Sequence, residues 1–173
     1  MRRIAANLTF IVAACFVGIL ALRSCGTPPS EQSLIEDFYA HRSEHELLHD
    51  MLLADKQVIR IASWGVETTT SPVPQIPPAG DFPVDRYKEY LKALTAVGGI
   101  VAIRGEGAHA DTYVGMWAFG WAGDTRHVSV CWKENVPTNL ASSLDDYHND
   151  KEHKQPHGVY RHIDGNWYLW ADW

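Results

Sequence analysis

The chain has 173 residues, of which 21 are acidic and 15 are basic, and its formal net charge is −6. This length predicts one domain rather than several. The excess of acidic side chains repels phosphate backbones, so we expect no nucleic-acid partner. Two of the three cysteines, Cys15 and Cys25, lie near the N-terminus, which leaves Cys131 without a partner for a disulfide inside the domain.

The first 24 residues are predicted to be a signal peptide or a signal-anchor. A basic start, with Arg2 and Arg3, precedes 19 residues without charge at positions 4–22. Such a segment is typical of export signals, and its length is close to the roughly 20 residues that span a bilayer. The positive start keeps the N-terminus in the cytoplasm, so we expect the rest of the chain outside it.

The end of this segment, Leu22-Arg23-Ser24-Cys25, resembles the lipobox of bacterial lipoprotein precursors. The resemblance covers the first 26 residues and implies cleavage before Cys25, lipidation of Cys25 and a place in the bacterial cell envelope. Arg23 departs from the family pattern, which has a small or apolar residue there, so an uncleaved transmembrane anchor is the alternative. Both alternatives tether the domain to a membrane, with 25–32 as a tether and 33–173 as a single domain.

The first half of the domain is predicted to contain two helices and one strand. A stripe of apolar residues predicts a helix over 31–55, and alternation predicts a strand over 56–67. Residues 68–83 contain five prolines and are expected to form an extended loop, because proline is excluded from helices and central strands. A second apolar stripe predicts a helix over 84–97.

The second half is predicted to be mainly β. Residues 100–106, 112–121 and 126–132 read as three strands of a meander, and a long polar segment with one helical turn follows. Asp164-Gly165 between two apolar runs predicts a hairpin of 158–163 and 166–173. The fold class is therefore α+β, a mostly antiparallel sheet of about six strands with two helices packed on one face.

The stretch His45-Glu46-Leu47-Leu48-His49 resembles the H-E-x-x-H motif of zincin metallopeptidases. That chemistry needs two imidazoles one helical turn apart on one zinc, and a glutamate that polarises the bound water. The third ligand is missing at the spacings these families use, and no sheet precedes the helix. We therefore expect no cofactor, with zinc bound by His41, His45 and His49 as the alternative.

Aromatic residues are concentrated in the second half, which holds six of the seven tryptophans. The strands place these rings on both faces of the sheet, and only one face packs on the helices. The other face is covered by the proline-rich loop or serves as an aromatic surface for a ligand or partner. The candidate surface residues are Trp117, Trp121, Trp167, Trp170 and Trp173.

These observations predict an exported, membrane-tethered domain without enzymatic activity that binds a protein or another ligand. An immunity or inhibitor protein is one version, since the part after residue 24 keeps 15 − 3 = 12 basic against 21 acidic residues and would suit a basic partner. The alternative is a zinc-dependent hydrolase or a metal-binding protein that uses the helix with the histidine motif.

Overall fold

The computed structural model describes residues 26–105, 110–121, 124–149 and 158–172. Its elements are α2 (Glu31–Ala40), α3 (Arg42–Ala54), β1 (Val58–Ala62), β2 (Gly65–Thr68), β3 (Ser71–Gln75), α4 (Val84–Ala96), β4 (Val101–Arg104), β5 (Thr112–Trp121), β6 (Asp124–Trp132), α5 (Leu144–Asn149), β7 (Val159–Asp164) and β8 (Trp167–Asp172). The predicted signal segment and Cys25 lie outside the described residues. Among the helices that are described, none is long and apolar enough to cross a membrane.

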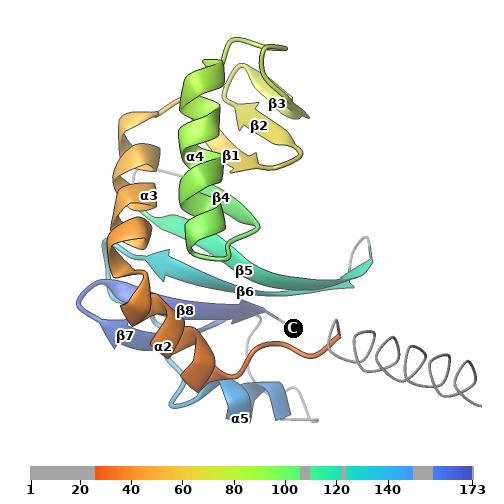
Figure 1. Cartoon of the computed structure of the whole chain (residues 1–173). Coiled ribbons are helices and arrows are strands. Elements are labelled where there is room, and N and C mark those ends of the chain that lie inside the picture. The colour runs from red at the N-terminus through yellow and green to blue at the C-terminus, as the bar shows by residue number, and fades with distance from the viewer. Residues whose placement is uncertain (1–25, 106–109, 122–123, 150–157, 173) are drawn as a thin grey trace, which may run out of the picture.

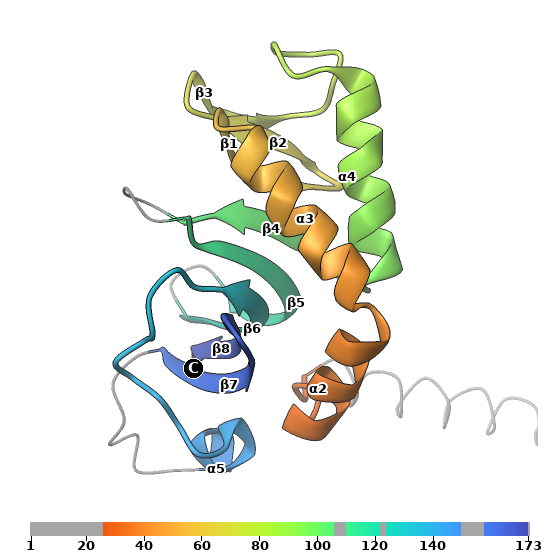
Figure 2. The ribbon, with the colours of Figure 1, turned by 90° about the vertical axis from the view of Figure 1, so that its left-hand side faces the viewer.

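The strands form one antiparallel sheet in the order β3-β2-β1-β4-β5-β6-β8-β7. Helices α2, α3 and α4 lie on one face of it, and α5 lies near β7 (Figures 1 and 2). The predicted α+β class with an antiparallel sheet is confirmed. The predicted count of about six strands and two helices is wrong, because the described residues contain eight strands and four helices.

One extra strand arises because the segment predicted as a single strand over 56–67 is a hairpin. The chain turns at Ser63 and Trp64, and Ala62 pairs with Gly65 across the turn. Gly65 has a φ of 137°, and a Cβ there would lie 2.9 Å from the backbone nitrogen of Gln75 in β3. Only glycine accommodates both conditions. The hydroxyl of Tyr87 in α4 donates a hydrogen bond of 2.8 Å to the carbonyl oxygen of Ala62 and ties the turn to the helix layer.

The other extra strand, β3, lies within the proline-rich segment that was expected to be a loop. Pro72 and Pro74 have no backbone N–H. Neither can donate the hydrogen bonds that a strand with a neighbour on each side needs. β3 is the first strand of the sheet and pairs only with β2, so the missing donors are tolerated there. The exposed side chain of Val73 lies between the two prolines.

The helix predicted over 31–55 is two helices, α2 and α3, that meet at His41. His41 has backbone angles of −122° and 27°, outside the helical range. The change of direction lets the two helices cover different parts of the sheet. α2 contributes Leu34 and Phe38 to a core cluster with β6, β7 and β8, whereas α3 contributes Leu48 and Leu52 to a second cluster with α4, β1 and β4.

Glu31 fastens the start of α2 to the other end of the chain. Its carboxylate accepts hydrogen bonds from Nε of Arg161 at 2.9 Å and from the backbone N–H of Leu144 at 2.6 Å. Its own backbone N–H donates to Asp145 in the first turn of α5. The folded domain therefore begins within the segment predicted as a tether over 25–32.

Candidate functional site

The face of the sheet opposite α3 and α4 carries a hollow. The strand register produces it by placing small side chains next to one another. One row of cross-strand neighbours is Val101, Gly115, Ser129, Trp170 and Tyr160. The two smallest side chains of this row are adjacent and lie between larger ones. A Cβ on Gly115 would approach Cγ1 of Val101 to 2.7 Å, so even alanine would crowd this floor.

A cavity of about 610 Å³ lies over these small residues. Its lining consists of Arg60, Trp64, Ile100, Val101, Ile103, Arg104, Gly105, Tyr113, Gly115, Trp117, Ala118, Thr125, His127, Ser129 and Trp170. It crosses five adjacent strands, β1, β4, β5, β6 and β8. Because neighbouring strands lie about 4.8 Å apart, the cavity is a trough roughly 19 Å long. Its volume lies within the range of about 300–1,000 Å³ that is usual for small-molecule sites.

Trp170 forms the aromatic end of the cavity. Its ring lies 4.5 Å from that of His127 and 5.7 Å from that of Tyr113, measured between ring centroids. Gly158, which precedes β7 and has a φ of 77°, lies against it, because a Cβ there would lie 2.8 Å from Nε1 of Trp170. The indole is therefore held in place by its neighbours before any ligand arrives.

Two cations near the cavity, Arg60 and Lys133, are engaged within the sheet, and Arg104 is a further cation in the lining. Nε of Arg60 donates to Oε2 of Glu67 at 3.0 Å, and a second contact joins the same two side chains. Lys133 lies beyond Trp170, where its ammonium group donates to the hydroxyl of Tyr113 at 2.9 Å and to the carboxylate of Asp111. The lining is mainly aliphatic and aromatic, with Ser129 in the floor and further polar side chains from Arg60, Arg104, Thr125 and His127.

Cys131 lies on this same face but is not available for chemistry. It is fully buried, and its thiol donates to the carbonyl oxygen of Tyr168 at 3.4 Å. Burial raises the pKa of this thiol, so the nucleophilic thiolate is disfavoured.

The tryptophans predicted to form one surface lie in different environments. Trp167 is 5% exposed and packs under the helices, whereas Trp170 lines the cavity. A bulge between Gly115 and Trp117 shifts the register, so Trp117 packs against the core cluster beneath α2 and also borders the cavity. The side chain of Trp121 and the whole of Trp173 lie outside the described residues.

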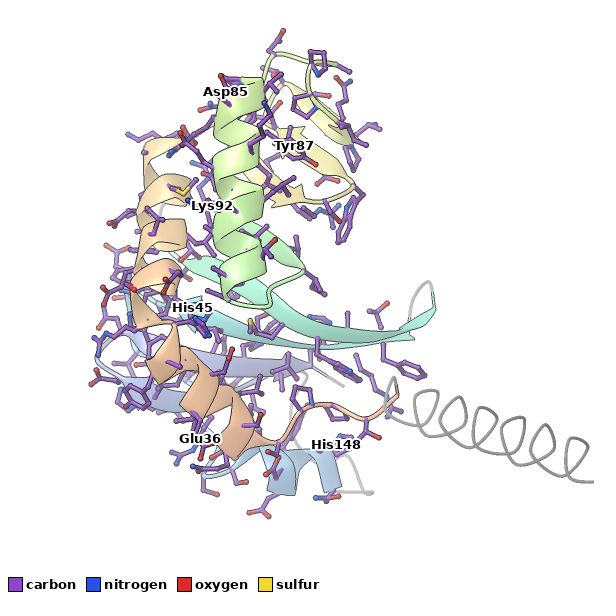
Figure 3. All side chains as sticks on the ribbon, in the orientation of Figure 1. Glu36, His45, Asp85, Tyr87, Lys92 and His148 are labelled. Carbon is purple, nitrogen blue, oxygen red and sulfur yellow. The ribbon has the colours of Figure 1, made fainter. Side chains whose placement is uncertain are left out.

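His45, the first histidine of the H-E-x-x-H motif, is buried in the core. Its side chain points from α3 toward the sheet (Figure 3), where its ring lies 5.5 Å from that of Phe38 and 6.1 Å from that of Trp167. Neither ring nitrogen has a hydrogen-bond partner in the described part of the chain. Burial lowers the pKa of His45 to about 4, so the imidazole is neutral at pH 7.

The other two histidines have separate partners. Nδ1 of His49 shares a hydrogen bond of 2.9 Å with the hydroxyl of Thr112, and its ring stacks on Trp132 at 4.4 Å. His41 lies at the junction of α2 and α3, 3.8 Å from the carboxylate of Asp37. Burial lowers the pKa of His49 as well.

These positions do not fit the zinc site of a hydrolase. Such a site needs three protein ligands around one point and an open position for water. Within residues 26–105, 110–121, 124–149 and 158–172, no group of three His, Cys, Asp or Glu side chains is arranged to hold a metal ion. The core rings around His45 occupy the space that a zinc-bound water would need.

Sequence reasoning missed the apolar half of the cavity. Trp64, which is 49% exposed, was placed inside a strand but lies at the β1–β2 turn and reaches the rim. Ile100 precedes β4 and is exposed beside it. The signal present in the sequence is the pair of small residues Gly115 and Ala118 among the bulky side chains of β5.

Comparisons with models of protein families, with curated proteins and with solved structures gave no match.

Proposed function

We propose that this protein is an exported, membrane-tethered binding domain that takes up a small, mainly apolar ligand in the cavity on the open face of its sheet. The observation that carries the proposal is the 610 Å³ hollow over Gly115 and Ser129, with aromatic rings at both ends. Trp64 supplies one ring, and Trp170 supplies the other.

The lining indicates the chemistry of the ligand. Ile100, Val101 and Ile103 provide aliphatic walls, and the two indoles offer flat faces for a ring system. Arg60 is paired with Glu67, and Arg104 is a second cation in the lining. We infer an elongated, mainly apolar molecule with an aromatic or alicyclic body and a hydrogen-bonding group that reaches His127 or Ser129.

The place of action follows from the N-terminal segment. The basic start, the uncharged run at 4–22 and the lipobox-like Cys25 support export and attachment of the domain to a bacterial membrane. A membrane-attached carrier or sensor of apolar molecules would meet its ligand at this location. The acidic surface leaves a basic partner protein compatible with the same proposal.

Extraction of the bound molecule tests the proposal. Full-length chain and an Ala118→Trp variant are purified from membranes, and extracted small molecules are compared by mass spectrometry. Ala118 is exposed and lines the cavity, so the indole should obstruct it without disturbing the core. Ala40→Trp, at an exposed position of α2, is the matched control.

We expect one molecular species to accompany the parent and the control, and to be depleted at least tenfold in Ala118→Trp, equivalent to about 1.4 kcal/mol of binding. If every species occurs equally in the three preparations, the cavity is not the binding site.

A further inference from the structure

The far ends of β5 and β6 form a two-stranded arm that leaves the rest of the sheet. Among the residues that the structure describes, β4 pairs with β5 as far as Gly115, and β8 pairs with β6 as far as His127. Beyond these points, the described pairs of 119–121 are all with 124–126. Figure 1 shows both strands extending past their neighbours.

The arm exposes an aromatic ring next to a cation. Phe119 is 51% exposed and stands directly across from Arg126, so the two side chains leave the same face of the arm. The ring of Phe119 lies over that of Trp117, with 6.2 Å between their centroids. Because a two-stranded ribbon is marginally stable in water by itself, an additional surface against this face would stabilise it.

The start of the described chain lies against this face. A Cβ on Gly26 would lie 3.6 Å from two ring carbons of Phe119. Cys25, the candidate lipid attachment site, is the preceding residue, and consecutive Cα atoms are about 3.8 Å apart. Whether the tether is a lipid on Cys25 or an uncleaved segment before it, it joins the described chain at Gly26, which lies beside the arm.

From this placement we propose that the β5–β6 arm rests on the membrane surface, with Phe119 in the headgroup region and the guanidinium of Arg126 against lipid phosphates. The inference rests on the proposed membrane tether. Phenylalanine is among the apolar side chains that interfacial segments bury at the boundary between headgroups and acyl chains, and arginine binds phosphate oxygens. The acidic charge of the remaining domain argues that contact depends on apolar burial rather than on attraction to anionic lipid.

The contact would orient the domain. The cavity borders the base of the same arm, through Ala118, Thr125 and His127. An arm lying on the membrane therefore holds one end of the cavity close to the bilayer, which is the phase in which an apolar ligand is concentrated.

Depth-dependent quenching tests the inference on the full chain, expressed in bacterial membranes and reconstituted into vesicles of phosphatidylethanolamine with a minority of phosphatidylglycerol. A fluorophore is placed on Phe119→Cys, and in a separate variant on Thr125→Cys, which keeps both proposed contact residues and lies on the other face of the arm. Val73→Cys is the control, because Val73 is 66% exposed on β3, an edge strand that three strands separate from β5. The parent chain corrects for labelling of its own cysteines.

We expect nitroxide-bearing lipids to quench the Phe119 fluorophore most strongly, the Thr125 fluorophore on the other face of the arm less strongly, and the Val73 fluorophore not at all. Raising the salt concentration should change this quenching little. If the chain floats with the vesicles and neither arm position is quenched, the arm contact is wrong while the tether stands. If the chain does not float with the vesicles, the proposed tether fails and the arm inference fails with it.

Discussion

Trp167→Ala is expected to lower the free energy of unfolding by about 3–5 kcal/mol, as large-to-small changes of buried aromatic residues do. The indole is buried where α2, α3 and β8 meet, with ring centroids 5.4 Å from Phe38 and 6.0 Å from His49. Its removal would leave a void between both helices and the sheet. Urea denaturation of the domain beginning at Gly26 measures the effect.

Trp170→Ala is the matched control for this substitution. It removes the same side chain from the same strand, three residues later, but from the partly exposed open face. We expect a clearly smaller loss of stability, because less surface is buried there. Equal losses for the two variants would contradict the assignment of Trp167 to the core and Trp170 to the cavity.

His45→Leu is expected to raise the free energy of unfolding at pH 7 by roughly 1–3 kcal/mol, the usual penalty for a buried polar group that lacks partners. Leucine is similar in size to histidine and suits the apolar surroundings of Phe38 and Trp167. A zinc ligand would behave in the opposite way, because its removal would cost stability in the presence of the metal.

The acid sensitivity of the domain should change in the same variant. The unfolded chain protonates His45 near pH 6.5, whereas burial holds the pKa in the folded domain at about 4. The unfolded state therefore binds more protons between these values, and His45 should cost about 3 kcal/mol of stability as the pH falls from 6.5 to 4. This contribution is complete below pH 4 and absent above pH 6.5.

Denaturation at pH 7, 6, 5 and 4 separates this contribution from that of other groups. His162→Gln, at an exposed histidine of the β7–β8 hairpin, is the control and should retain the acid sensitivity of the parent. A His45→Leu variant that loses stability in acid as steeply as the parent would show that His45 is not buried in its neutral form.

Local patterns predicted the elements whose signals lie within the element itself. The apolar stripe of Val84–Ala96 and the Asp164-Gly165 turn needed no distant partner to be recognised. The elements that were predicted wrongly depend on tertiary context. Pro72 and Pro74 forbid a central strand but not an edge strand, and the position of β3 at the edge is set by the rest of the sheet.

In the candidate site, too, local patterns are visible in the sequence, whereas features that depend on tertiary context are not. Alternation along β8 correctly separates Trp167 from Trp170, but it does not reveal which face the helices cover. The bulge before Trp117 reverses the alternation of β5 and has no sequence signal that we identify. The hollow itself arises because Gly115 and Ser129 become neighbours only when β5 and β6 pair in this register.

The cavity as a binding site is the central claim, and titration with the neutral apolar fluorophore N-phenyl-1-naphthylamine tests it most directly. The domain beginning at Gly26 is titrated as the parent, as Ala118→Trp and as Ala40→Trp, with the fluorophore excited directly. We predict saturable binding to the parent and the Ala40→Trp control, and binding at least tenfold weaker, about 1.4 kcal/mol, to Ala118→Trp. Equal affinity for all three proteins, or no saturable binding to any of them, would show that the cavity is not a binding site for such molecules.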